Sequence, residues 1–414
     1  MNNSKSKTKL TTISKSTSKI FKTLKKSSSS NIIFIKKKNV SENLKVIEDY
    51  KKICYKHLLN PNEIFLEQLP KNQINIYIDN YTLKEINVIS KLLENHFSFK
   101  HIRLGNKNPN KKEFIFKNQN TKEKEKNSKE KKDERDKKLL FLKKKNSIIK
   151  GLSTQINLSL NILSISITDL YLSEDCSIIL SKGLSENNSI QRIAINNCNI
   201  NLKPFEIIIG SLLNHTSISY IDLSYNNLKD KYGKILGRII SRQNQRRDQI
   251  LWENNLRNEK SIKFNGLKGL ISLGLKGNLL NEITSFYLCN SLLNDNYIRA
   301  IDLSENNLNK ESCKNFIRIM RKNTILLNID LKNNPGYDEE IHARIVMKMS
   351  KNIKILYSNY LNDEFSEDEF NEIKGFINQS FFDVDIPEKI IDVYNSNFEE
   401  FKDKDNSDNE DKDN

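Results

Sequence analysis

Residues 218–228 read ISYIDLSYNNL, and residues 298–308 read IRAIDLSENNL, almost the same words eighty residues later. Both fit the pattern L-x-x-L-x-L-x-x-N/C-x-L, in which a short strand leads into a turn that carries an asparagine or a cysteine. IQRIAINNCNI (190–200) and LISLGLKGNLL (270–280) fit the same pattern. The four segments therefore belong to one internal repeat.

The position of the asparagine or cysteine, called the slot below, recurs at a fixed distance. It falls at residues 170, 198, 226, 278, 306 and 334, with spacings of 28, 28, 52, 28 and 28. Leu170 fills the first slot, and NIYIDNYTL (75–83) and FKHIRLGNK (99–107) look like two earlier, degenerate repeats. The period predicts an α/β leucine-rich-repeat solenoid of the ribonuclease-inhibitor type, with a parallel sheet on the concave face and helices on the convex face.

A period of 28 residues leaves room for a full helix after each strand, and segments such as KPFEIIIGSLLNH carry apolar residues at helical spacing. In each strand the apolar residues, such as Ile221 and Leu223, should point into the core. If successive repeats stack, one residue from each strand must lie beside its counterpart in the next. We expect this of Ile193, Ile221, Leu273, Ile301 and Ile329.

Composition divides the chain further. We predict a basic tail (1–40), an N-terminal helical cap with degenerate repeats (41–106, helical over 44–69), a Lys/Glu-rich insertion (107–146), the repeats (147–356), a C-terminal helical cap (357–397) and an acidic tail (398–414). The last repeat helix is expected over 338–352.

The net charge of +16 is concentrated in two of these segments: residues 1–40 carry +11 and residues 107–146 carry +9. The rest of the chain is then about −4, which argues against a basic nucleic-acid-binding face on the folded part. The two basic segments could contact acidic surfaces such as tubulin tails, RNA or membranes, or could simply be solvated. A microtubule contact through residues 1–40 is a hypothesis that unchanged co-sedimentation after their deletion would contradict.

Several classes of protein find no support. The five cysteines form no CxxC pair and the five histidines are scattered, so neither a metal site nor a cofactor is expected. No phosphate loop, nucleophile elbow or kinase motif is present, so no catalytic residue is predicted. Residues 1–19 lack an apolar core for a secretory signal, although they superficially resemble a transit peptide, and no stretch is apolar enough for a membrane span.

The spacing of 52 equals one period plus 24 residues, so we predict an insertion at about 240–263. SRQNQRRDQILWENNLRNEKS there should extend the preceding helix and end in a loop, with Trp252, the single tryptophan of the chain, on its apolar strip. Insertions in a repeat array emerge at one edge. Arg246, Arg247, Trp252, Leu256 and Arg257 could form a partner-binding site, since Trp and Arg are favoured at interface hot spots. Alternatively, Trp252 packs back on the array and the arginines pair with nearby acids.

The insertion also carries a resemblance. GKILGRIISRQNQRRDQILWENNLRNEKSIKFNGLKGLISLGLKGNLL is similar to the matching segment of the 78-kilodalton centrosomal protein family, with Gln245, Arg246, Arg247, Trp252, Leu256 and Arg257 at or close to register. The resemblance covers roughly residues 45–340. Two features differ: no long coiled-coil region follows the repeats here, and residues 107–146 are gained.

The resemblance implies a protein of the cytoplasm and cytoskeleton, at the centrosome, centriole or basal body of the cilium. It also implies roles in centriole organisation and cilium assembly, with centrosomal or ubiquitin-pathway proteins as partners. The repeat pattern by itself implies only a non-enzymatic protein-interaction scaffold.

A second candidate surface lies on the outward positions of the strands. Stacking would align Asp222, Gly274, Asp302 and Asp330 about 4.8 Å apart on the concave face, with Tyr220 two residues before Asp222. These residues could form a groove for a basic peptide, or an ordinary solvated surface.

Three alternatives to the centrosomal scaffold remain at this stage. A repeat array of this type could activate a small GTPase, which a GTP-hydrolysis assay on a panel of GTPases would reveal. It could be a generic cytosolic adaptor. RNA binding through the Lys-rich segments would weaken steeply with salt and survive loss of the array.

Overall fold

The computed structural model describes residues 44–107, 128–257 and 268–361. The chain divides into two compact units, Met1–Ile74 and Asn75–Asn414. In the first unit, the helices predicted over 44–69 are present as a helix over residues 44–56, α2 (Glu63–Leu66) and the 3-10 helix η1 (Leu69–Lys71). Asn62 caps α2 by accepting a hydrogen bond from the Phe65 N–H at 3.1 Å, and the Phe65 ring lies 5.0 Å from that of Tyr50.

The strands form one eight-stranded sheet in which each strand neighbours the next in the sequence. The pairings from β2 to β8 are parallel. The strands are β1 (Gln73–Tyr77), β2 (His101–Gly105), β3 (Ser164–Thr168), β4 (Arg192–Asn196), β5 (Tyr220–Asp222), β6 (Ser272–Gly274), β7 (Ala300–Asp302) and β8 (Asn328–Asp330). The two degenerate segments do supply strands β1 and β2.

The register of the sheet is the one that stacked repeats require. Ile193 pairs with Ile221, Ile221 with Leu273, Leu273 with Ile301, and Ile301 with Ile329. All five side chains are buried. The stacking prediction is confirmed, and the 52-residue spacing leaves the pairing of β5 with β6 unchanged.

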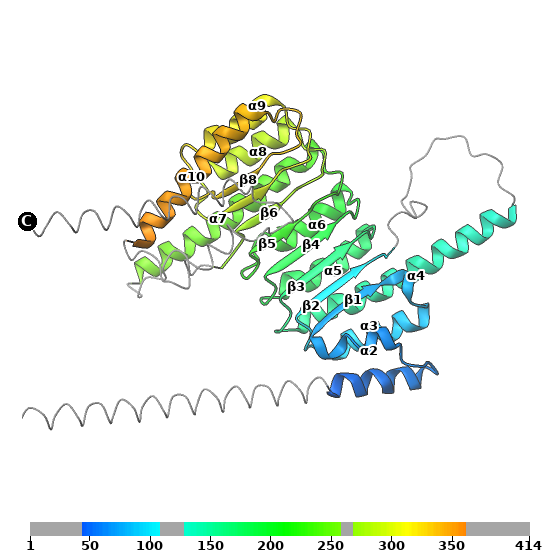
Figure 1. Ribbon diagram of the computed structural model, residues 1–414. Helices are drawn as coiled ribbons and strands as arrows, with labels where there is room; N and C mark the ends of the chain where they lie inside the picture. Colours follow the sequence, from blue (N-terminus) through cyan, green and yellow to red (C-terminus); the bar gives the residue numbers. More distant parts are fainter. Residues whose placement is uncertain (1–43, 108–127, 258–267, 362–414) are drawn as a thin grey trace, which may run out of the picture. The chain divides into compact units, whose positions relative to one another are not determined.

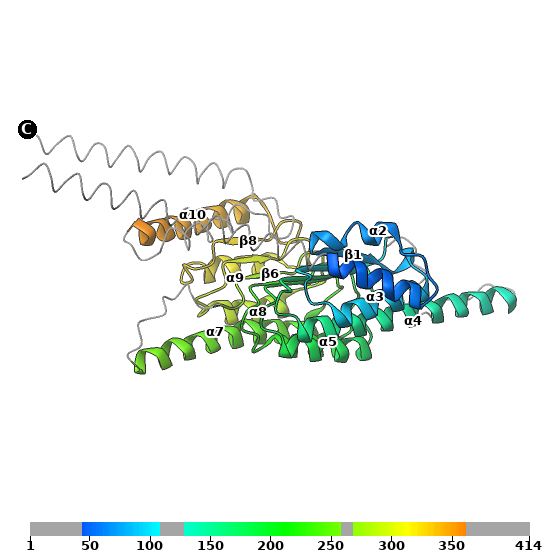
Figure 2. The ribbon, with the colours of Figure 1, turned by 90° about the horizontal axis from the view of Figure 1, so that it is seen from below.

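The helices alternate with the strands, and α5 to α9 lie side by side along one face of the sheet (Figures 1 and 2). They are α3 (Leu83–Asn95), α4 (Ser128–Leu158), α5 (Glu174–Glu186), α6 (Leu202–Leu212), α7 (Gly233–Leu256), α8 (Glu282–Leu292), α9 (Lys310–Ile319) and α10 (Glu339–Leu361), with 3-10 turns η2 (Ile78–Asn80) and η4 (Asp230–Tyr232). Strand, helix and register together make this the expected leucine-rich-repeat solenoid. Helix α10 fulfils the prediction for 338–352.

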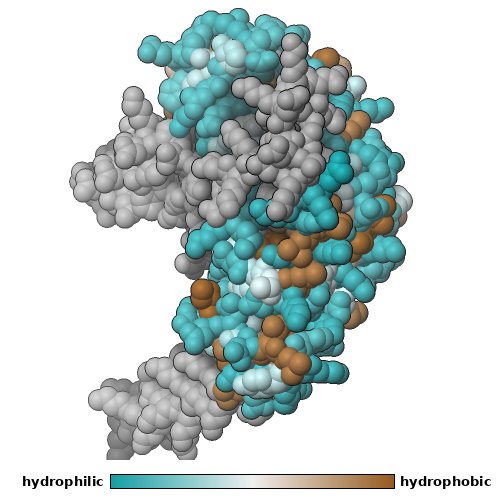
Figure 3. Space-filling model, turned by 90° about the vertical axis from the view of Figure 1, so that its right-hand side faces the viewer, coloured by the Kyte–Doolittle hydropathy of each residue, from teal (hydrophilic) through white to brown (hydrophobic). Residues whose placement is uncertain are grey.

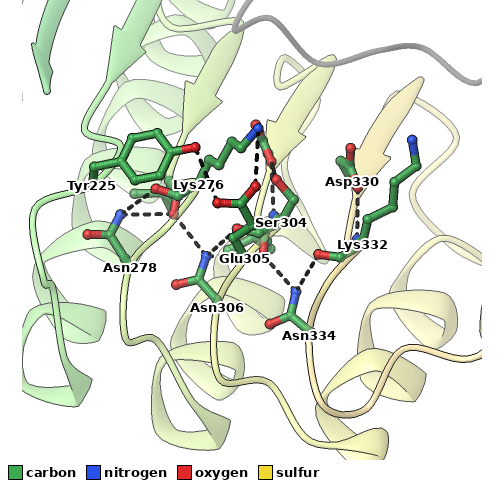
Figure 4. A network of polar contacts seen from close by, with 12 residues as sticks. Tyr225, Lys276, Asn278, Ser304, Glu305, Asn306, Asp330, Lys332 and Asn334 are labelled. Atoms are coloured by element: carbon green, nitrogen blue, oxygen red, sulfur yellow. Dashed lines mark hydrogen bonds and ion pairs between the residues drawn. The ribbon is translucent and has the colours of Figure 1, made fainter. Parts of the chain in front are cut away.

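The slot asparagines join consecutive repeats through their side-chain amides (Figure 4). The Asn306 Nδ2 donates to the carbonyl oxygens of Leu275, Leu303 and Ser304 at 2.9–3.0 Å. Its Oδ1 accepts from the Leu280 N–H at 3.1 Å. Asn226, Asn278 and Asn334 make the same kind of contacts to the repeats before them. Backbone groups that turn out of the sheet would otherwise be buried without partners.

A second row of buried polar residues, which our sequence analysis missed, lies seventeen positions after the slots at 170, 198, 226, 278 and 306. Asn187, Gln243 and Asn323 donate from their side-chain amides to carbonyl oxygens at the end of the preceding helix, such as Ile156, Leu212 and Leu292. Their side-chain oxygens accept from the backbone that leads into the next strand. These three amides therefore satisfy carbonyls that a helix terminus leaves unpaired.

Helix α4 crosses the predicted boundary at residue 146. Its residues 128–146, assigned above to the Lys/Glu-rich insertion, are continuous with the repeat helix. The buried Lys145 donates to the Tyr171 carbonyl at 2.9 Å and lies 5.4 Å from the Tyr171 ring centroid. Burial lowers the pKa of Lys145. The high lysine content of this segment suggested that it is solvated. Lys145 is instead buried and bonds to the repeat whose slot holds Leu170.

Several predicted segments lie outside the described residues. These are the basic tail (1–40), the first part of the insertion (up to residue 127), most of the C-terminal cap (from 362) and the acidic tail (398–414).

Replacing a slot asparagine should destabilise the array. For Asn306→Ala we expect the free energy of unfolding to fall by about 2–4 kcal/mol, because several buried backbone groups lose their partner. Urea denaturation of the full chain measures the change. Asn307→Ala, at the adjacent exposed position, is the control. Equal effects of the two substitutions would contradict the role given to the slot.

Candidate functional site

Helix α7 is the element that the insertion enlarges. It has 24 residues, whereas α6 and α8 have 11 each, and its distal end projects beyond its neighbours (Figures 1 and 2). The predicted helical extension is therefore present. The loop predicted after it falls at residues 258–267, outside the described residues.

The second polar row fixes where the insertion begins. Gln243 follows its slot by seventeen residues, as Asn187 and Asn323 do, so α7 keeps the repeat register up to Gln243. Its side-chain oxygen accepts from the Leu270 N–H at 3.4 Å, at the start of the next repeat. The 24 extra residues consequently lie between Gln243 and Leu270. The predicted span of 240–263 began slightly too early.

Arg247 is not on the docking surface where we predicted it. Its side chain is 1% exposed and its guanidinium carbon lies 3.8 Å from the centroid of the Tyr297 ring. The group donates to the carbonyl oxygens of Leu270 at 2.8 Å and Gln243 at 3.2 Å. Burial lowers the pKa of Arg247 to about 10, opposed by the nearby Asp295. This cation, stacked and hydrogen-bonded, anchors α7 to the repeats that follow.

Two acids complete this anchor. The Tyr297 hydroxyl donates to the Asp248 carboxylate at 2.9 Å. Asp295, which occupies the second polar row, accepts from the N–H groups of Tyr297 and Ile298 at 2.9 and 2.6 Å. Burial raises the pKa of Asp295. The insertion is thus joined to the next repeat by charged and aromatic groups rather than by a wholly apolar contact.

Gly269 is required where the chain approaches this anchor. A Cβ added there would lie 3.0 Å from atoms of Arg247 and of Gln243, and the backbone φ is +156°. A larger residue would displace the guanidinium from the Leu270 carbonyl.

Arg246 lies between the anchor and the surface. It is half-buried and donates to the Lys268 carbonyl at 2.7 Å. Burial lowers its pKa. Arg246 therefore holds the returning chain beside α7, which leaves it little freedom to bind a partner.

The remaining predicted residues of the insertion are exposed at the distal end of α7. Trp252 is 62% and Leu256 64% exposed, and Arg257 is exposed as well. Because Trp252 and Leu256 are four residues apart, they share one face of the helix. Ile250 and Leu251 are half-buried. Of the two interpretations left open above, this geometry favours an exposed tryptophan over one packed on the array.

The row of aspartates on the sheet is aligned as predicted, since Asp222 pairs with Gly274, Gly274 with Asp302 and Asp302 with Asp330. Yet Asp222, Asp302 and Tyr220 are buried, and only Asp330 is half-buried. The expectation that these residues present an open groove is therefore corrected.

The physical reason is local hydrogen bonding. Asp222 accepts from the N–H and hydroxyl of Ser224 at 3.0 and 2.6 Å, and Asp302 accepts likewise from Ser304 at 2.9 and 2.7 Å. Asp330 accepts from the Lys332 N–H at 2.8 Å. Asp–x–Ser contacts of this kind shape the turn after each strand.

An ion-pair cluster that the sequence analysis did not single out lies beside this row (Figure 4). The Lys276 ammonium is 3.4 Å from the Glu305 carboxylate, which accepts from the Tyr225 hydroxyl at 3.2 Å. The three residues come from successive turns, so an alignment of the repeats by their slots would have placed them together.

Within the described residues, no three His, Cys, Asp or Glu side chains are grouped so that they could hold a metal ion. Of the helices in the described ranges, none combines the length and apolar character that crossing a bilayer requires.

Comparison with known proteins gives a consistent picture. No family model matches the chain. It is 25% identical to the human centrosomal protein of 78 kDa over 214 residues, which are 51% of this chain and 31% of that protein. It is 22% identical to the Drosophila melanogaster Cep78 homolog over 205 residues, 48% of this chain and 25% of that one.

The relatives are centrosomal proteins. The resemblance read from the sequence is confirmed to this extent, and the chain spans about a third of the human relative's length. Among solved structures, a tropomodulin C-terminal domain from Caenorhabditis elegans matches 46% of this chain and 99% of its own, with 15% identity and a TM-score of 0.35.

Loss of the buried guanidinium should weaken the attachment of α7. For Arg247→Met we expect the free energy of unfolding to fall by about 2–4 kcal/mol, because the Leu270 carbonyl loses a charged donor. Gln245→Met, at an exposed position of the same helix, should change it little. Both are measured by chemical denaturation. A silent Arg247→Met would show that the guanidinium does not hold α7.

The buried Asp302 should make stability depend on pH. Burial raises the pKa of its carboxyl to about 6, and the neighbouring Asp330 contributes to the rise. The folded chain then binds a proton more tightly than the unfolded chain, so ionisation costs stability as pH rises through about 4–6.

Asp302→Asn removes this cost. Relative to the unaltered chain, the variant should gain about 1–3 kcal/mol in the free energy of unfolding between pH 4 and pH 7.5. Urea denaturation at the two pH values measures the difference. A difference that does not change with pH would show that Asp302 ionises normally.

Proposed function

We propose that this chain is a non-enzymatic protein-binding scaffold of the centrosome or basal body, with a role in centriole organisation and cilium assembly. The similarity to centrosomal proteins over half of the chain supports the location. The repeat architecture supports the scaffold role, because stacked repeats provide long, rigid surfaces that bind other proteins.

The observation that carries the proposal is the distal end of α7. A rigid helix presents exposed Trp252 and Leu256 on one face, while Arg247 anchors the same helix in the array. Large exposed apolar groups are costly to keep in water, and on a pre-positioned helix they lose little freedom on binding. We infer that this end of α7 docks a protein partner, with Arg257 at its rim.

The partners proposed from the resemblance are centrosomal or ubiquitin-pathway proteins. A protein groove that accepts an apolar side chain pair at helical spacing would fit the α7 end.

Replacing the two apolar residues should remove the chain from the centrosome. For Trp252→Ala with Leu256→Ala we expect affinity for the docked partner to fall about 10–100-fold, as for other hot spots. Imaging of a tagged full-length chain in its own cell, beside a centriole marker, measures the loss of the focus. Asn255→Ala, at a neighbouring exposed position, is the matched control.

The outcomes separate the two parts of the proposal. A diffuse signal from the unaltered chain would overturn the centrosomal location. A focus that the double variant retains at full intensity would overturn the role of the α7 end and leave the location intact.

A further inference from the structure

In α3, α5, α6 and α8 two positions on the repeat helix face solvent, and they provide an internal reference. They are the second and fifth residues after the N-cap. In α3, α5, α6 and α9 these positions hold Lys84 and Asn87, Asp175 and Ile178, Lys203 and Glu206, and Glu311 and Lys314. Each of these pairs contains at least one charged residue, as expected of a surface that only meets water.

Helix α8 departs from this reference. Its residues at the same two positions are Ile283 and Phe286, which are 52% and 60% exposed. Leu279, just before the helix, is also exposed. Among the helices with a described N-cap, α8 is the one in which both positions are apolar. The repeat pattern therefore does not account for these two exposed apolar side chains. Figure 3 shows the kind of surface with which they are compared, a mainly hydrophilic face that carries some apolar groups.

The helix beside this apolar pair is strongly basic. Helix α7 packs closely on α8, since a Cβ added at Gly233 would lie 2.8 Å from the Thr284 Cα. The exposed side chains there include Lys231 in η4 and Lys234 and Arg238 in α7. Residues 233–247 contain no acid. Lys234 and Arg238 are four residues apart and so share one face of the helix.

On the other side of α8, charged residues of α9 form ion pairs. On α9, Glu311 accepts from Arg318 at 2.5 Å and Lys310 lies 2.6 Å from Asp338. Glu282 at the start of α8 accepts from the Asn309 amide at 3.0 Å. Beside Ile283 and Phe286, Lys234 and Arg238 of α7 therefore add positive charge, while Glu282 keeps its negative charge at the start of α8.

We propose that Ile283 and Phe286, flanked by Lys234 and Arg238, bind an acidic amphipathic helix of a partner protein. Apolar residues of that helix at i and i+3 or i+4 would cover the pair, and its carboxylates would meet the α7 side chains. Aliphatic and aromatic side chains on a helix suit this partner better than stacked nucleic-acid bases, which need aromatic platforms.

This surface is distinct from the distal end of α7. Trp252 follows Gly233 by nineteen residues, which is about 28 Å along a helix. The scaffold would then hold two partners at once, and loss of one surface would leave the other intact.

Photo-cross-linking in the cell tests the proposal directly. The full-length chain carries p-benzoylphenylalanine in place of Phe286, and a matched chain carries it in place of Glu206, the equivalent position on α6. We expect a cross-link at 286 that 206 does not give, to a segment rich in Asp and Glu with apolar residues at helical spacing. No cross-link above the control would overturn the proposal. So would cross-links to RNA, to lipid, to a basic segment or to this chain itself.

A binding measurement then tests the chemistry. The cross-linked segment is synthesised with a fluorescent label and titrated with the purified full-length chain. Phe286→Asp should weaken binding about tenfold or more, and Lys234→Glu with Arg238→Glu should weaken it about fivefold and reduce its salt dependence. Glu206→Gln should leave it unchanged. Since all these positions are exposed, the variants should keep the melting temperature of the unaltered chain. Tight binding that survives both sets of substitutions would overturn the proposal.

Discussion

From the slot at Asn226 onward, the side-chain amide of one asparagine ties each repeat to the one before it. The Asn278 side chain accepts from the N–H groups of Asn226 and Leu228 and donates to the Leu223 and Leu275 carbonyls. Those backbone groups lie where the chain leaves the sheet and can find no partner in the ladder between strands. The asparagine side chain supplies the hydrogen bonds that these backbone groups need when they are buried. Only stacking at a constant period places the side chain next to them. The parallel register, the buried rows of isoleucine and leucine, and the helices on one face all depend on that constancy.

The insertion does not disturb this stacking, because it begins after the buried polar groups of its repeat have made their hydrogen bonds. Gln243 is the member of the second polar row in this repeat, and Leu270 begins the next strand segment. Arg247 then bonds the Leu270 carbonyl from the first turn of inserted helix. Buried side chains hold the two ends of the insertion together, and the repeats after it keep the same register as those before it. An exposed Trp252 at the far end is compatible with this closure, since it has no part in it.

Period and slot were enough to predict the fold, including the pairing of Ile221 with Leu273 across the interruption. They gave the strands of the two degenerate repeats as well. The sites were harder, because residue type alone does not tell a buried cation from an exposed one: Arg246 and Arg247 are adjacent, and only Arg247 meets the Tyr297 ring. The aspartates failed as a groove for a similar reason, since each has a nearer partner in its own turn. A chain rich in lysine also concealed Lys145, whose role depends on α4 lying beside Tyr171. The row of Asn187, Gln243, Asp295 and Asn323 was available in the spacing and was overlooked because its residue types differ.

One conformational detail has a consequence for how such an array tolerates change. The residue before each slot adopts a left-handed backbone, with φ of 56° at Asp169, 52° at Asn197, 59° at Tyr225, 63° at Gly277, 54° at Glu305 and 59° at Asn333. Asparagine, aspartate and glycine enter this region readily, whereas tyrosine and glutamate do so at some cost. The two residues that bear this conformational cost, Tyr225 and Glu305, belong to the cluster with Lys276. The Tyr225 ring covers the Cα of Gly277, where a Cβ would clash with it. In the course of divergence these turns are therefore free to exchange small polar residues for one another, while Gly277 is held fixed by a side chain from the neighbouring coil.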